Sequence, residues 1–291
     1  MIALDILNPR IEFGDCVEAI FDWLTAHVQW LFDLITVVIT GLYDGLNTVL
    51  SSPPYWVMMI IFAGLAWLAG GLRRGWKLAI FAFVGFYLIR AFDQWVQSMS
   101  TIALVLIAVL IALLIAIPIG ILAAKSKWVS AIVRPLLDLM QTMPGLVYLV
   151  PVMIIFGIGP VPGVVATMIF AMPPGIRLTE LAIRQVDVEV VEAGQAFGSS
   201  SGKILRQIQI PLAMPTIMAG VNQVIMLALS MVVIAGFAGA GGLGGEVNRA
   251  LQTLNLGLGA EAGMAVVIIA VYMDRLSAAV GNRGRANELR R

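Results

Sequence analysis

The sequence predicts an all-α integral membrane protein, a polytopic helical bundle with about seven transmembrane helices. Three observations support this fold class: the composition is strongly apolar, apolar segments recur at membrane-spanning length, and basic residues gather between alternate segments. Hydrophobic residues make up 60% of the chain and charged residues 12%, and the mean hydropathy is +0.96. Because ordinary soluble domains carry about twice that share of charge, a soluble fold is excluded.

Apolar segments of spanning length follow one another from residue 55 onward. A helix that crosses the bilayer needs about 20 mostly apolar residues. The predicted spans are residues 55–72, 76–92, 98–124, 139–158, 161–179, 211–240 and 261–280. The third is the most apolar, with no charge between Met99 and Ala124. Glycines and prolines in residues 157–162 predict a tight turn between the fourth and the fifth.

The first fifty residues predict another kind of helix. From Val17 to Val49, apolar and polar positions both recur with a period of about 3.6 residues, which is typical of an amphipathic helix. Trp23 and Trp30 suit the depth of the membrane interface. Residues 1–54 are therefore expected to form an extracytoplasmic segment with an interfacial helix. A helix that only packs against the bundle fits the same pattern equally well. If the helix instead spans the membrane, the N-terminus lies inside and the number of transmembrane helices rises to eight.

Basic residues indicate the orientation. With residues 180–210 in the cytoplasm, all but three of the 18 Lys and Arg residues are cytoplasmic. The exceptions are Arg10, Arg90 and Arg249. Because cytoplasmic loops carry the excess of Lys and Arg, the N-terminus is expected outside and the C-terminus inside. A permease domain over 55–280 and a cytoplasmic basic tail over 281–291 complete the predicted organisation.

Residues that perform chemistry are scarce. Cys16 is the only cysteine and His27 the only histidine, which excludes internal disulfides, cysteine metal clusters and a histidine triad. A net charge of +1 argues against a nucleic-acid partner. Residues 198–203 resemble a phosphate-binding loop, but three residues rather than four separate the glycines, and Ile204 follows the lysine. We therefore expect no catalytic residue, metal or cofactor in this chain.

One long polar loop predicts an exposed helix–turn–helix. Asp187 can cap a helix over 188–197, and Gly198 stands where chains leave a helix in the left-handed conformation. Ser199 or Ser200 can cap a second short helix through residue 209, which Pro211 would stop. Ala193, Ala196 and Phe197 are expected on or near the exposed surface. Small residues there permit close approach, and the aromatic ring is a candidate anchor for a partner groove. On capping chemistry alone, a loop that merely links two spans is the alternative.

This loop resembles the EAA loop of ABC-importer permeases, which reads Glu-Ala-Ala, three residues, Gly, nine residues, Ile, one residue, Leu-Pro. The matching positions are Glu192, Ala193, Gly198, Ile208 and Pro211. Gly194 replaces the third alanine and Ile210 the leucine. The resemblance implies that the loop seats in a cleft of each ATP-binding subunit, with Glu192 as a charged contact or internal brace and Gly198 as the bend.

The membrane core contains candidate residues for a transport path. Prolines between residues 144 and 174 break or kink helices, and broken helices often mark such a path. The candidates are Gln141, Thr142, Met143, Pro144, Met172, Asn222, Gln223, Met226 and Ser230. Kinked packing, hydrogen bonds between helices and methionine as a gap filler are the alternatives. Glycines over residues 236–245 predict a flexible outer loop or a simple non-helical connector.

Residues 138–144, 161–166, 170–174 and 222–244 resemble the permease subunit of glycine betaine/proline betaine ABC importers, a likeness that covers roughly 55–280. It implies the type I ABC importer permease (MetI-like) fold, a homodimer in the bacterial cytoplasmic membrane, and alternating access. The implied partners are two ATP-binding subunits, which hold ATP and Mg, and an extracytoplasmic substrate-binding protein. The expected cargo is glycine betaine; choline, carnitine, proline or another amino acid is the alternative. An ion-coupled secondary carrier is disfavoured because no span centre holds a carboxylate or lysine.

Overall fold

A computed structural model describes residues 13–71 and 75–288, with side chains placed as far as Gly281, and over these residues the chain is helical apart from short connections. The elements are α2 (Phe13–Ser51), α3 (Tyr55–Gly70), α4 (Trp76–Ala91), α5 (Trp95–Lys125), α6 (Lys127–Thr142), α7 (Gly145–Phe156), α8 (Pro160–Arg184), α9 (Val188–Ala196), α10 (Ser201–Ile204), the π-turn η1 (Leu205–Gln209), α11 (Ile210–Ala235), the 3₁₀ turn η2 (Gly236–Ala238), α12 (Gly242–Gln252) and α13 (Leu256–Glu288). Arg10, Arg73, Arg74 and the side chains of the basic tail lie outside this description.

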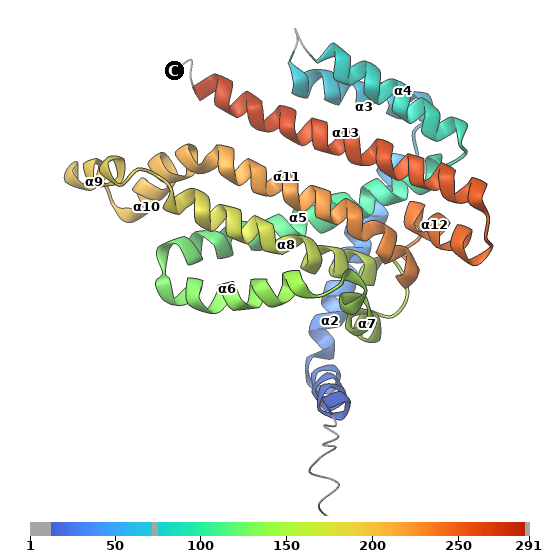
Figure 1. Cartoon of the computed structure of the whole chain (residues 1–291), viewed down its shortest axis with the longest axis horizontal. Coiled ribbons are helices and arrows are strands. Elements are labelled where there is room, and N and C mark those ends of the chain that lie inside the picture. Colours follow the sequence, from blue (N-terminus) through green and yellow to red (C-terminus); the bar gives the residue numbers. More distant parts are fainter. Residues whose placement is uncertain (1–12, 72–74, 289–291) are drawn as a thin grey trace, which may run out of the picture.

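The core lies where α5, α8 and α11 pack against one another, with α13 alongside α11 (Figure 1). Small residues allow this packing: Ala108 and Ala112 of α5 have no exposed surface. At Gly120 the α5 and α8 backbones come so close that an added Cβ would lie 2.6 Å from Cβ of Thr179. Because apolar lipid gives no hydrophobic drive between helices, such close approach is the main source of attraction in a membrane bundle.

The all-α membrane fold is confirmed, with changes in the spans. Among the described residues, five helices are long and apolar enough to cross a bilayer, and a bent pair makes a sixth. The five are Gly14–Ser51, Trp95–Lys125, Pro160–Arg184, Ser201–Ala238 and Leu256–Gly281. Helices α3 and α4 have 16 residues each. That length gives about 24 Å of helix, less than the roughly 30 Å of hydrocarbon core, so these two predicted spans fall short on their own.

The predicted span over 139–158 is wrong as a single helix, because α6 and α7 form the bent pair and meet at 101°. Met143, directly before Pro144, is extended with φ −78° and ψ 132°, as the ring of a following proline requires. The hydroxyl of Tyr148 donates to the carbonyl of Met140 and satisfies one acceptor at the end of α6. The chain therefore turns a corner at Met143, which we call the α6–α7 corner.

The glycine-rich segment is partly helical and closely packed: Gly236 lies in η2 and residues 242–245 lie in α12. The predicted non-helical connector is therefore confirmed only at residues 239–241, and the prediction of one continuous loop is wrong. A Cβ added to Gly236 would lie 2.2 Å from the carbonyl carbon of Gly244. The hydroxyl of Thr101 on α5 accepts a hydrogen bond of 2.8 Å from the backbone N–H of Leu243. These glycines serve close backbone contact between η2, α12 and the end of α11, rather than freedom of movement.

Helix α2 is steeply inclined to α8, α11 and α13 in Figure 1, and it contacts α5, α7 and α8. Its second half packs on the bundle through Ile39, Tyr43 and Leu50, which are buried at helical spacing. Trp23 and Trp30 are exposed. The interfacial position of this helix stays a prediction.

Candidate functional site

The polar loop between α8 and α11 contains the predicted first helix, α9. The carboxylate of Asp187 accepts a hydrogen bond of 3.0 Å from the backbone N–H of Glu189, so the predicted cap is confirmed. After α9, Gly198 has φ +75°, and the N–H of Ser199 donates to the carbonyl of Gly194 over 3.1 Å. This is the hydrogen bond of a Schellman end, and it confirms the predicted left-handed bend.

The second half of the loop differs from the prediction. Helix α10 and the π-turn η1 continue without a stop into α11, and Ser200 makes no capping bond with its side chain. In η1 the N–H of Ile210 donates to the carbonyl of Leu205, five residues earlier. A proline ring normally clashes with the carbonyl four residues before it, and a π-turn widens the helix at that point. Pro211 therefore lies within a continuous helix, and the prediction that it stops the helix is wrong.

The loop has an exposed side and a packed side. The exposed residues include Glu192, Ala193, Ala196, Phe197 and Gly198. The ring of Phe197 is 90% exposed. On the packed side, Gly194 is buried against the side chains of Ile204 and Ile208. Within the described residues Glu192 makes no hydrogen bond or ion pair, which leaves its carboxylate available for contact with another chain. We call the exposed residues the docking side.

Gly194→Leu is expected to open the loop, whereas Gly194→Ala is expected to be tolerated. A Cβ at Gly194 would lie 2.8 Å from Cδ1 of Ile208, the movable end of a side chain, and alanine gains up to about 1 kcal/mol of helix propensity. Leucine overfills the space, at about 1–3 kcal/mol. Limited proteolysis of the loop tests this: the leucine variant should be cleaved about tenfold faster, and equal rates for both variants would contradict the packing.

The predicted path residues fall into separate groups. Gln141, Thr142, Met143 and Pro144 lie at the α6–α7 corner. Gln223, Met226 and Ser230 form an exposed line along α11, which we call the α11 stripe. Met172 is half-buried against the core. Gly145, at the start of α7, lies against Met231 of α11, whose sulfur would be 3.1 Å from an added Cβ. The corner therefore lies beside the second half of α11.

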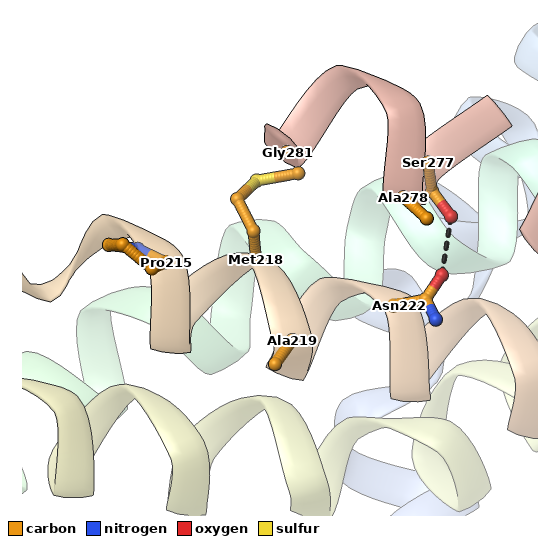
Figure 2. A pocket seen from close by; sticks show the side chains of 7 residues that line it. All are labelled: Pro215, Met218, Ala219, Asn222, Ser277, Ala278 and Gly281. Carbon is orange, nitrogen blue, oxygen red and sulfur yellow. Dashed lines mark hydrogen bonds between the residues drawn. The ribbon is translucent and has the colours of Figure 1, made fainter. Parts of the chain in front are cut away.

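Asn222 turns away from the α11 stripe toward α13 (Figure 2). Its side-chain amide donates to Asp274 over 2.9 Å, and the hydroxyl of Ser277 donates to its carbonyl oxygen. Asn222 and Ser277 border an open pocket of about 200 Å³ between the two helices. The observed partners are those of a helix–helix contact, the alternative to a path role. Sequence reasoning overlooked Asp274, although a carboxylate late in a predicted span was a usable signal.

Asn222→Ala is expected to lower the thermal stability of the purified protein, because it leaves the half-buried carboxylate of Asp274 without its amide donor. A lost hydrogen bond to a charged group costs about 1.5–3 kcal/mol. Gln223→Ala is the matched control, since Gln223 is adjacent, exposed and without a hydrogen-bond partner among the described residues. Thermal unfolding in detergent should separate the two variants, and equal melting temperatures would refute the interhelical role.

Sequence reasoning also overlooked Glu180, near the end of α8. Its carboxylate is 4% exposed, and one oxygen accepts hydrogen bonds from Ser130 (2.8 Å) and Arg134 (3.0 Å) of α6. Arg184, one turn later on α8, pairs with the same oxygen at 2.9 Å. A buried carboxylate needs such partners, because desolvation of an unpaired charge costs roughly several kcal/mol. No local pattern in the sequence indicates that Glu180 has hydrogen-bond partners 46 and 50 residues away.

Solved structures share this fold. A chain of the MetNI methionine ABC transporter, in inward-facing conformations, matches with a TM-score of 0.54 over 64% of this chain and 92% of that one. The identity is 23%, so the match supports the fold alone. It confirms the predicted MetI-like architecture.

Relatives match over nearly the whole chain. OpuAB of Bacillus subtilis, a glycine betaine transport system permease protein, is 48% identical over 269 residues, which are 92% of this chain and 94% of that protein. ProW of Escherichia coli, a glycine betaine/proline betaine transport system permease protein, is 46% identical over 99% of this chain and 81% of its own length. GbuB of Listeria monocytogenes, a glycine betaine/carnitine transport permease protein, is 46% identical over 96% of this chain and 98% of its own length.

Residues 116–283 also match the model of the family described as binding-protein-dependent transport system inner membrane component. The match begins within α5 and runs through α13, so it includes the polar loop, the α6–α7 corner and the α11 stripe. The chain therefore belongs to this family of inner membrane permease subunits of ABC importers.

Proposed function

We propose that this chain is the permease of an ATP-driven importer for a quaternary-amine osmoprotectant, with glycine betaine as the first candidate. The observation that carries the substrate assignment is identity of 46–48% over more than nine-tenths of the chain with three permeases named for glycine betaine. The permease passes substrate by alternating access. A substrate-binding protein delivers the substrate from outside.

The docking side of the polar loop is the contact for the ATP-binding subunit, of which two copies hold ATP and Mg. Its support is an aromatic ring that is 90% exposed, next to small residues that permit close approach. Aromatic side chains in such a position are typical anchors of protein interfaces. When ATP closes the partner dimer, the loops move together and the spans open outward.

A second copy of the chain completes the path, with Gln141, Thr142, Met143, Pro144 and the α11 stripe along the dimer axis. Its support is that Gln223 is exposed on a spanning helix and has no hydrogen-bond partner among the described residues. A bare amide against lipid is costly, so such a group favours contact with a second subunit or with a water-filled path. Asn222 and Met172 do not line this path; they pack the helices that surround it.

The permease lies in the inner membrane, and we place its N-terminus outside and its C-terminus in the cytoplasm. Its support is that Lys125, Lys127, Arg184, Lys203 and Arg206 all lie on elements at the end of the bundle that carries α9, left in Figure 1. Basic residues gather on the cytoplasmic side of membrane proteins. Helix α12, at the opposite end, then faces the substrate-binding protein.

Carnitine is the second candidate cargo, because one of the relatives is named for glycine betaine and carnitine. Choline, proline and other amino acids have no such support. An ion-coupled carrier leaves the docking side of the loop without a role, and it receives no support from Asp274, which is held by Asn222.

Reconstitution tests the proposal. The chain, its cognate ATPase and its binding protein are placed in vesicles, and uptake of labelled glycine betaine is measured with and without ATP on the ATPase side. Uptake that requires both ATP and the binding protein is the expected result. Competition with unlabelled carnitine, choline and proline ranks the cargo. Hydrolysis without betaine uptake would reject the substrate, and uptake by the chain alone would reject the importer mechanism.

A further inference from the structure

The carboxylate of Glu180 connects three helices at the end of the bundle that carries the polar loop. Ser130 and Arg134 reach it from α6. Arg184 forms an ion pair with it on α8 and donates a hydrogen bond of 2.8 Å to the carbonyl of Ala123, at the end of α5. We call Glu180, Ser130, Arg134 and Arg184 the Glu180 network.

Helix α6 has few buried contacts besides this network. Along its 16 residues α6 buries only Ser130 and Leu137, and Leu137 packs against Ala116 and Ile176. Val133 and Met140 are partly buried against the same cluster, and most other side chains of α6 are exposed, with Trp128 83% exposed. By contrast, α5 and α8 are already held together by backbone contact at Gly120. Loss of the polar contacts therefore frees α6 from α8 far more than it separates α8 from α5.

The network also lies at the base of the polar loop. Only Gln185 and Val186 separate Arg184 from Asp187, the cap of α9. A displacement of α9 thus acts on the last turn of α8, because so short a connection allows little independent movement. At its other end α6 leads into the α6–α7 corner. The Glu180 network therefore lies between the polar loop and the bent pair of helices α6 and α7.

We propose that Glu180 is a positioning residue that couples the polar loop to α6, so that loop movement reaches the α6–α7 corner. This inference rests on the proposed function of the loop as the ATPase contact. Glu180 touches neither substrate nor ATP in this mechanism; it keeps α6 moving with α8. Two hydrogen bonds and an ion pair on one buried oxygen make this contact stiff, since each hydrogen-bond donor fixes a direction.

A second pair bridges the same two helices and provides the control. Arg177 of α8 forms an ion pair with Asp138 of α6, and both side chains are well exposed, at 39% and 68%. Exposed ion pairs contribute little because water and salt screen them. Asp138→Asn therefore removes a carboxylate between α6 and α8 without disturbing a buried joint.

The experiment compares Glu180→Gln, Ser130→Ala and Asp138→Asn in the complete reconstituted complex. The readout is substrate taken up per ATP hydrolysed, because a defect in folding or assembly lowers both quantities together and leaves their ratio unchanged. Glu180→Gln is expected to lower the ratio about tenfold. Ser130→Ala, which leaves both arginine contacts, is expected to lower it about threefold, and Asp138→Asn is expected to match the native chain.

An unchanged ratio in Glu180→Gln and Ser130→Ala would overturn the inference. So would an equal loss in Asp138→Asn, since it would indicate general loosening of α6. If Glu180→Gln does not assemble, Ser130→Ala decides alone. Gly198→Val, measured in parallel, separates this inference from the proposed function of the loop. If Gly198→Val loses coupling and Glu180→Gln keeps a normal ratio, only the role of Glu180 is rejected. If Gly198→Val keeps normal coupling, the loop is rejected as the ATPase contact.

Discussion

Replacing Gly244 with alanine is expected to prevent the native packing of α11, η2 and α12. An added Cβ would lie 2.3 Å from the backbone oxygen of Val232 and 3.2 Å from the backbone nitrogen of Gly236. Backbone atoms of a packed helix have no rotamer through which to move aside, so the helices must separate. Overpacking costs about 1–3 kcal/mol, and a clash with backbone atoms lies at the upper end, a large part of the stability of a folded chain.

The neighbouring residue gives the control. An added Cβ on Gly245 would meet nothing within 4 Å, and Gly245 also lies in α12. Gly245→Ala should therefore be neutral or slightly stabilising. The fraction of chain that stays monodisperse in detergent, and its melting temperature, measure both variants. Normal behaviour of Gly244→Ala would show that the close backbone contact is absent from the protein.

Gly198→Val is the second change with a large expected effect, here on coupling to the ATPase rather than on folding. Gly198 has φ +75°, and an added Cβ would meet nothing within 4 Å. The penalty is therefore conformational: an ordinary residue loses roughly 1–2 kcal/mol in the left-handed region, and a β-branched residue at least as much. The end of α9 is expected to unwind, which displaces the docking side.

Gly198→Asn is the control, because asparagine enters the left-handed region more easily than other side chains. Stimulation of the partner ATPase by the permease and the substrate-loaded binding protein is the measurement. In the valine variant the stimulation should fall about tenfold, which corresponds to about 1.4 kcal/mol. The asparagine variant should retain most of the stimulation. Equal activity of both variants would contradict the need for a left-handed residue at the bend.

Features set by neighbouring residues could be predicted from the sequence. The cap at Asp187 and the bend at Gly198 follow local rules of helix ends, and both were predicted at the right residues. Four of the predicted spans, residues 98–124, 161–179, 211–240 and 261–280, follow from composition in the same way. By contrast, Pro211 was expected to stop a helix by a local rule, and the π-turn before it makes the helix continuous.

Features that depend on distant segments could not be predicted. Glycines near Gly236 indicate either freedom or close contact, and only the position of Gly244 decides between them. The partners of Asn222 lie 52 and 55 residues away on α13, and those of Glu180 lie on α6. A hydrogen-bond partner at such a distance leaves no periodic signal, because the pairing depends on how whole helices pack.

The bare ring of Phe197 has a consequence for how the complex is built. An aromatic side chain that is 90% exposed is a favourable feature only once a partner covers it, because until then it attracts other apolar surfaces, including those of chaperones and proteases. If the ATP-binding subunit covers this ring, as proposed, a permease made without that subunit keeps the ring exposed. Synthesis of both subunits together would shorten the time for which the ring is exposed. The exposed ring would also make the abundance of this chain depend on the supply of its partner.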